Sequence, residues 1–102
     1  MRIPVIKDII IMKNGDFINA NITTKIYAIK TSYGEIQVKK KDVAHIHMKG
    51  AQFNKDEVFT LEMNKFTGTL QQKIIEVKLQ SGEQIEIRKS KIHTIIILTN
   101  RT

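Results

Sequence analysis

Two clusters of basic side chains are the residues of this sequence whose type and spacing best suit contact with a ligand. Both are short runs of cations near the end of a predicted strand, and they comprise Lys39, Lys40, Lys41, Arg88, Lys89 and Lys91. Contacts to phosphate require little more than such cations. The clusters therefore predict a site for nucleic acid or another polyanion, and the alternative interpretation is two solvated turns. In both interpretations the charges are solvated, so replacing them should hardly change folding.

Tyr33 is the aromatic residue best placed to add base stacking to such a site. It lies in the predicted hairpin turn Thr31-Ser32-Tyr33-Gly34, where we expect it to be exposed. The other aromatic residues are interpreted as core or interface, and they are Phe17, Tyr27, Phe53, Phe59 and Phe66.

His45 and His47 would share one face of a strand, which is a geometry that can bind a metal ion. A third ligand is not evident, and Asp42 is the nearest carboxylate. The chain has no Cys, no Gly-rich phosphate loop and no paired carboxylates in an evident cleft. The sequence therefore predicts no catalytic residue, no metal site and no cofactor, and we expect that the protein is not an enzyme.

The chain is basic, with a formal net charge of +7 and a pI of about 9.8. This balance favours polyanion binding through counterion release, and it is also typical of a solubility surface in a Lys-rich proteome. Lys7 and Asp8 interrupt the first apolar residues, so these predict neither a signal peptide nor a membrane span. We expect no membrane partner and a cytoplasmic location.

The sequence contains two copies of one unit of about 48 residues. One residue, Gln84, is inserted in the second copy. The stretches that match in class and order are Asp8 to Ile11 with Asp56 to Phe59, Ile18 to Ile22 with Phe66 to Leu70, Lys25 to Lys30 with Lys73 to Lys78, and Ile36 to Ile46 with Ile85 to Ile95. We expect one repeat over residues 1–50 and a second over residues 51–102.

Each repeat is expected to form five short strands. Ile18, Ala20 and Ile22 alternate with polar residues, as in a half-buried strand, and turn signals such as Asn14-Gly15-Asp16 separate the strands. From Val38 to Ile46 the apolar residues are five and then three apart, which predicts a short helical turn. The fold class is therefore all-β. We expect two five-stranded barrels, joined through shared or swapped strands into one compact body.

This pattern resembles that of the Sm-like small β-barrel proteins. The first Sm-like motif, apolar-x-Asn/Asp-Gly-x-x-apolar-x-Gly-x-apolar, is matched from Met12 to Ile22, with Ala20 in place of the second Gly. The apolar spacing of the second motif, apolar-Arg-Gly-x-x-apolar-x-x-apolar, is matched from Val38 to Ile46 and from Ile87 to Ile95, with Lys in place of Gly. The resemblance implies a small five-stranded barrel. It implies RNA recognition less, because the base-binding loop of the family is missing. The pattern is also similar to short β-repeat modules of uncharacterised bacterial proteins.

Two continuous apolar runs, Ile9 to Met12 and Ile95 to Leu98, are typical of strands that are buried on both faces. A barrel of one repeat has no second core to bury them. We expect the runs to pack between the repeats, against another chain, or both, because exposed apolar edges would aggregate. They predict a homo-oligomer, most simply a two-fold dimer.

The predicted core occupies equivalent positions of the two repeats: Ile18, Ala20, Ile22, Ile29, Ile36, Val38, Val43 and Ile46, with Phe66, Gly68, Leu70, Val77, Ile85, Ile87, Ile92 and Ile95. The predicted function is a non-enzymatic binding module with a basic surface, for which RNA and DNA are candidate ligands. Its site residues are Lys39, Lys40, Lys41, Arg88, Lys89, Lys91 and Tyr33. The alternative is a structural or assembly protein that forms a symmetric homo-oligomer.

Overall fold

The computed structural model describes residues 7–50 and 55–100, and these residues form strands and two short 3-10 turns without an α-helix. The strands are β1 (Asp8–Met12), β2 (Phe17–Ile22), β3 (Ile26–Thr31), β4 (Gly34–Lys39), β5 (Val43–Gly50), β6 (Lys55–Thr60), β7 (Lys65–Leu70), β8 (Ile74–Lys78), β9 (Gln84–Arg88) and β10 (Ile92–Ile96). The turns η1 (Lys40–Asp42) and η2 (Lys89–Lys91) lie where the apolar spacing predicts them. The all-β fold and the helical turns are therefore confirmed. Phe53, interpreted from the sequence as core or interface, lies outside the described residues.

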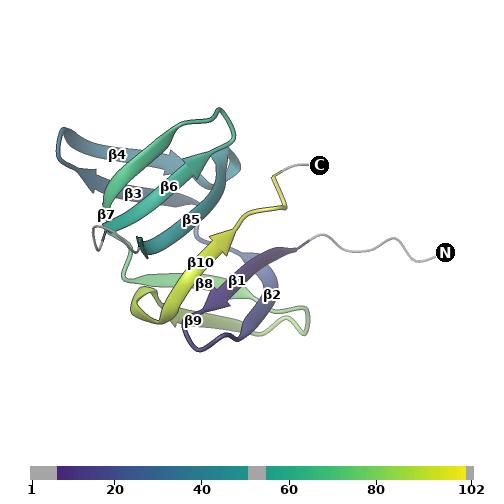
Figure 1. The fold of residues 1–102 in the computed structure, drawn as a ribbon. Helices are drawn as coiled ribbons and strands as arrows, with labels where there is room; N and C mark the ends of the chain where they lie inside the picture. The colour runs from purple at the N-terminus through teal and green to yellow at the C-terminus, as the bar shows by residue number, and fades with distance from the viewer. Residues whose placement is uncertain (1–6, 51–54, 101–102) are drawn as a thin grey trace.

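All ten strands belong to one antiparallel sheet in the order β4-β3-β7-β6-β5-β10-β1-β2-β8-β9. Figure 1 shows this sheet as two lobes: the first lobe contains β3 to β7, and the second contains β1, β2, β8, β9 and β10. Each lobe takes three strands from one repeat and two from the other, which confirms the expected exchange of strands within one compact body. The prediction of two closed barrels is wrong. The sheet stays open because β5 and β10 pair with each other and have no free edge to close their own lobes.

The two halves of the sheet are related by a pseudo-two-fold axis. Ile46 on β5 pairs with Ile95 on β10, which is its own equivalent in the second repeat. The neighbouring pairs obey the same symmetry, since Ile10 pairs with Ile95 in one lobe and Val58 pairs with Ile46 in the other. The axis therefore passes between Ile46 and Ile95, where the lobes meet.

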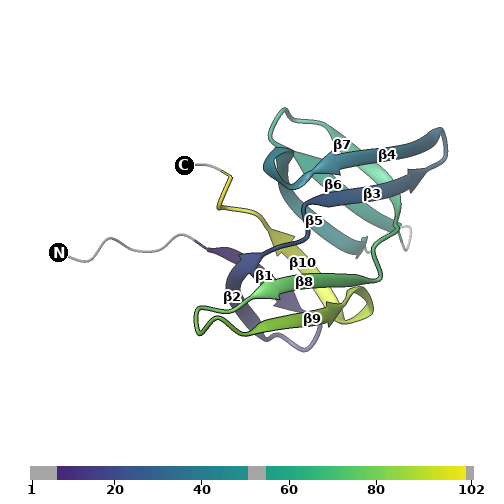
Figure 2. The ribbon, with the colours of Figure 1, turned by 180° about the vertical axis from the view of Figure 1, so that it is seen from behind.

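Two short connections carry the chain from one lobe to the other. Figure 2 shows the chain from behind as it passes from β2 to β3 and from β7 to β8. In the second connection, the Gln71 N–H donates to the Ala28 carbonyl at 2.7 Å, and the Ala28 N–H donates to Gln72 Oε1 at 2.9 Å. The equivalent bonds of the first connection join Thr23, Thr24 and Glu76. Side chains thus prolong the strand pairing into both crossings.

Most of the predicted core residues are buried. The exceptions are Ile18, Ile36, Phe66 and Ile85, which are half-buried and pack against the core. They form two equivalent pairs and lie close to the hairpin turns, where fewer strands cover them. Tyr27 is buried, as interpreted from the sequence, and so are Ile10 and Ile97 of the apolar runs. Phe17 is 69% exposed and is therefore not part of the core. Burial that the sequence did not predict occurs at Met48, Val58 and Ile75.

The two continuous apolar runs lie side by side at the junction of the lobes. Ile9 pairs with Ile96, and Ile10 pairs with Ile95. Ile10 and Ile95 are buried, whereas Ile9 and Ile96 on the other face are half-buried. Packing between the repeats is therefore confirmed, and packing against another chain stays a prediction.

Gly68 on β7 should tolerate no side chain. A Cβ atom there would overlap the backbone carbonyl of Lys30 on β3 and lie 3.1 Å from the Thr31 Cα. We expect Gly68→Ala to lower the free energy of unfolding by about 2 kcal/mol, because backbone rather than a flexible side chain must move. The equivalent residue in the other lobe is Ala20, which is buried and fits.

Urea denaturation measures this effect, with Ala20→Gly as the matched change. That change should cost about 1 kcal/mol, through chain entropy and one lost methyl group. A Gly68→Ala protein as stable as the wild type would show that β3 and β7 approach less closely than described.

Candidate functional site

The predicted basic residues separate into two groups in the structure. Four of them are exposed: Lys39, Lys41, Arg88 and Lys91. The other two, Lys40 and Lys89, lie at the junction of the lobes, and their side chains are 15% and 16% exposed. The expectation that all these charges are solvated is wrong for Lys40 and Lys89, because each pairs with a buried carboxylate.

Lys40 pairs with Asp8, whose side chain has no access to solvent. The Lys40 Nζ lies 2.9 Å from Asp8 Oδ2 and also donates to the Ile22 carbonyl at 2.6 Å. The same Asp8 oxygen accepts the Ile22 N–H at 3.1 Å. Asp8 begins β1 in the second lobe, whereas Lys40 begins η1 in the first lobe, so this ion pair fastens the two lobes together.

The second carboxylate oxygen of Asp8 holds the segment that follows β10. Asp8 Oδ1 accepts the Leu98 N–H at 2.9 Å and the Thr99 N–H at 3.1 Å. Asn100 then lies against the η1 turn, where its Nδ2 donates to the carbonyl oxygens of Lys40, Lys41 and Val43 at 3.0, 3.0 and 2.8 Å. The position of the η1 turn is therefore fixed both by the Lys40–Asp8 ion pair and by the hydrogen bonds from Asn100.

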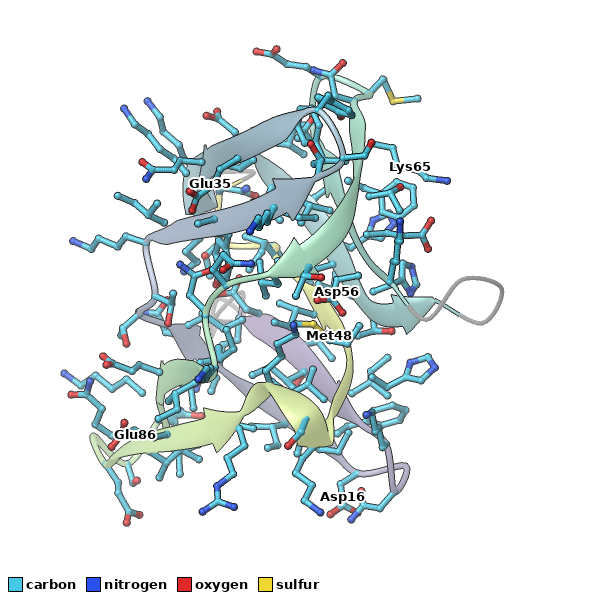
Figure 3. The ribbon with its side chains drawn as sticks, turned by 90° about the vertical axis from the view of Figure 1, so that its left-hand side faces the viewer. Asp16, Glu35, Met48, Asp56, Lys65 and Glu86 are labelled. Carbon is cyan, nitrogen blue, oxygen red and sulfur yellow. The ribbon has the colours of Figure 1, made fainter. Side chains whose placement is uncertain are left out.

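The second repeat builds the same ion pair from Asp56 and Lys89, whose Oδ2 and Nζ atoms are 2.6 Å apart. Lys89 also donates to the Leu70 carbonyl at 2.8 Å, and the Leu70 N–H donates to Asp56 Oδ2 at 2.7 Å. Figure 3 shows Asp56 in the middle of the molecule, where the lobes meet. Both central lysines of the basic clusters are thus structural.

The surroundings of Asp8 fix its charge. Burial alone would raise the pKa of Asp8, but the Lys40 ammonium and the N–H groups of Thr99, Ile22 and Leu98 together hold it below its usual value of 3.8. Burial, assisted by the charge of Asp8, raises the pKa of the Tyr27 hydroxyl. At neutral pH the carboxylate is therefore ionised and the phenol is neutral.

A pocket opens beside each of these ion pairs. The first pocket has a volume of about 490 Å³ and is lined by Lys25, Ile26, Lys39, Lys40, Lys41, Thr99 and Asn100. The second pocket has a volume of about 480 Å³ and is lined by Lys13, Met48, Lys73, Ile74, Arg88, Lys89 and Ser90. Volumes of this size are typical of small-ligand sites. Among these lining residues there is no carboxylate, so both pockets favour an anion.

Five pairs of equivalent positions recur in the two pockets: Lys25 with Lys73, Ile26 with Ile74, Lys39 with Arg88, Lys40 with Lys89, and Lys41 with Ser90, of which the last pair does not keep the charge. The isoleucines are 48% and 43% exposed, so each adds apolar surface to its pocket. Each lies directly across the hairpin from a cation, since Ile26 pairs with Lys39 and Ile74 pairs with Arg88. The repeat has therefore produced two basic pockets, and each contains one exposed isoleucine as an apolar patch.

Sequence reasoning missed Lys25 and Lys73, which precede β3 and β8 as single cations within polar connections. Their recurrence at one position of the repeat was the signal that could have found them. Lys91 does not line the second pocket, although its carbonyl accepts the Lys13 N–H at 3.0 Å. Tyr33 is 70% exposed, as expected, but it lies at the tip of the β3–β4 hairpin, roughly 17 Å along the strand from the first pocket.

His45 and His47 do share one face of β5, with ring centroids 5.0 Å apart. The His45 ring stacks on Phe59 at 4.3 Å, and His47 Nδ1 lies 3.3 Å from Thr94 Oγ1. Within residues 7–50 and 55–100, no three His, Cys, Asp or Glu side chains form a group that could hold a metal ion. The two histidines belong to a packed aromatic cluster on the sheet.

Comparisons with known proteins give no relative: no family model, curated protein or solved structure matches this chain. The described segments also contain no helix long and apolar enough to cross a membrane. The function must therefore be inferred from the pockets and the sheet themselves.

Lys40 and its neighbour Lys41 should respond very differently to the same substitution. Lys40→Met leaves a buried carboxylate without its cation, and we expect the free energy of unfolding to fall by about 2–4 kcal/mol. Lys41→Met removes an exposed charge and should change it by less than about 0.5 kcal/mol. Urea denaturation of both variants checks this, and equal effects would contradict a structural role for Lys40.

The Asp8 carboxylate should make stability depend on acid. Its pKa is lowered in the folded protein, so its contribution is fully present above the unfolded value of 3.8 and is lost as the pH falls through the folded pKa. The stability difference between wild type and Asp8→Asn should therefore be largest near neutral pH and shrink below about pH 4.

Unfolding free energies measured across this range for both proteins test the linkage. Asp42→Asn, which removes an exposed carboxylate of the η1 turn, is the control for the loss of one negative charge away from the Asp8 site. A constant difference between wild type and Asp8→Asn at all pH values would mean that the Asp8 pKa is the same in the folded and unfolded chains.

Proposed function

We propose that this protein is a non-enzymatic binding module that holds a polyanion, namely nucleic acid, in its two repeat-related basic pockets. The observation that carries the proposal is the recurrence of one arrangement in both repeats, in which exposed cations surround an exposed isoleucine beside a structural Lys–Asp pair. A solvated turn needs no exposed apolar side chain among its cations, whereas Ile26 and Ile74 are exposed beside the cations of the two pockets.

The cations that would contact phosphate are those not already neutralised in the fold. In the first pocket these are Lys25, Lys39 and Lys41, since Lys40 is bound to Asp8. In the second pocket they are Lys13, Lys73 and Arg88, since Lys89 is bound to Asp56. Three cations at each site, together with a net charge of +7, favour binding through phosphate contacts and counterion release.

The expected mode of recognition is contact with the backbone rather than with base edges. This chain resembles Sm-like proteins but lacks the base-binding loop of that family. Only short polar segments connect β2 to β3 and β7 to β8. Tyr33 is too far from the first pocket to stack on the nucleotide held there. A base on Tyr33 would belong to a nucleotide farther along the strand. A protein of this kind would act in the cytoplasm, which remains our expectation.

An assembly protein is the second candidate, and the open sheet favours it. Strands β4 and β9 are the ends of the sheet and leave one edge each without a neighbouring strand in the part of the chain that the structure describes. Such edges can pair with another chain. The sheet edges and the pockets have Lys39 and Arg88 in common, so the two functions are distinguished by their readouts, which are oligomer size and oligonucleotide affinity.

Binding to labelled single-stranded and duplex oligonucleotides should weaken when either pocket loses two of its cations. We expect Lys25→Gln with Lys41→Gln, and Lys73→Gln with Arg88→Gln, each to lower the affinity about tenfold at low salt and to reduce the log–log salt slope by roughly 1.4 to 1.8. Fluorescence anisotropy over a salt series measures both quantities. Lys40 and Lys89 are left intact because replacing them would disturb the fold.

The control removes the same charge elsewhere. Lys30 and Lys78 are equivalent, exposed residues of β3 and β8 that do not line either pocket. Lys30→Gln with Lys78→Gln should leave the affinity within about threefold of the wild type. If this control weakens binding as much as the pocket variants do, net charge rather than the pockets is responsible. If the wild type is not retained on a polyanion column at low salt, the proposed function is wrong and assembly becomes the better candidate.

A further inference from the structure

The two ends of the open sheet differ in a way that matters for assembly. Figure 3 shows Glu35 on β4 and Glu86 on β9 toward opposite ends of the molecule. Along β4 the exposed side chains are Glu35, Gln37 and Lys39, and along β9 they are Gln84, Glu86 and Arg88. The strands are equivalent in the repeat, but their charge patterns are not the same.

On β4, the backbone N–H and C=O groups of Glu35, Gln37 and Lys39 point outward from the free edge of the sheet. Ala28 on β3 uses its N–H and C=O to bond Gln72 and Gln71, on the side away from β4. Gln37 is the cross-strand partner of Ala28. In an antiparallel ladder, the backbone N–H and C=O of Gln37 therefore point away from β3, toward the free edge. The alternation places the outward groups of Glu35 and Lys39 on this edge as well.

We propose that β4 pairs antiparallel with β4 of a second copy of this chain, about a two-fold axis at Gln37. This register sets Glu35 opposite the partner's Lys39, and Lys39 opposite the partner's Glu35. It also places Ile36 beside the partner's Val38 on the other face, where both positions already face the core of their own lobe. Backbone bonding, charge and apolar contact therefore agree on one register.

The β9 edge does not pair with itself in the same way. The equivalent register would set Glu86 opposite the partner's Glu86, and like charges directly opposite each other are destabilising. The inferred assembly is thus a closed two-fold dimer through β4 rather than a growing fibre. The proposal rests on the edge of the sheet and not on nucleic-acid binding.

A charge-reversal cycle tests the register. Glu35→Lys and Lys39→Glu should each raise the dimer dissociation constant at least about tenfold, because each creates two like-charge contacts across the axis. The double variant restores opposite charges in swapped positions and should return to within about threefold of the wild type. The single variants change net charge in opposite directions, so a net-charge effect cannot weaken both. Sedimentation velocity over a concentration series measures the constants.

Three results would overturn the proposal. A wild-type protein that remains monomeric at tens of micromolar excludes the dimer. A double variant as weak as the single variants excludes the register. Loss of association on Arg88→Glu, together with concentration-dependent growth beyond a dimer, indicates instead that β4 pairs head-to-tail with β9, where Glu35 would face the partner's Arg88. Failure of oligonucleotide binding leaves this test unaffected, since its readout is oligomer size alone.

Discussion

A carboxylate without access to water is the constraint on which the rest of this structure depends. An ionised side chain in that position is tolerated only if donors surround it, and those of Asp8 come from three separate parts of the chain: the end of β2, the η1 turn and the segment after β10. All three must be in place at once, so the pair fixes where one lobe meets the other. The second repeat satisfies the same constraint with Asp56 and Lys89. We expect a buried pair of this kind to contribute more to the choice of one arrangement than to net stability.

The anchored turn also determines what the surface offers. Because Lys40 points inward, its neighbours Lys39 and Lys41 project outward at the rim of the first pocket. One run of three lysines thereby supplies both a buried ion pair and the rim of a pocket, and the inward residue limits the movement of the outward ones. A site whose backbone is held in this way loses little freedom when an anion binds, which favours affinity. Lys89 plays the same part beside Arg88 at the second pocket.

The repeat, the short strands and the 3-10 turns could be predicted because each depends on local spacing. Ile18, Ala20 and Ile22 alternate, and Val38, Val43 and Ile46 fit a helical turn, whichever strand lies next to them. The open sheet could not be predicted, since equivalent hairpins of the two repeats present nearly the same edge and the sequence does not say which one a strand will choose. The site was foreseen only in part for a related reason. Lys39, Lys40 and Lys41 are one residue type, and only the position of Asp8 in space separates the buried cation from the exposed ones.

The crossing of the hairpins also bears on how the chain folds as it is synthesised. Ile22 at the end of β2 pairs with Val77 on β8, fifty-five residues later, so the first hairpin leaves the ribosome long before its partner strand exists. Its neighbour on the other side, β10, is made later still. Until then the apolar face of β1 and β2 has no native cover, and the second lobe can form only after β10 has emerged. Folding of this lobe should therefore be slow relative to synthesis of its first hairpin, with aggregation as its main competitor.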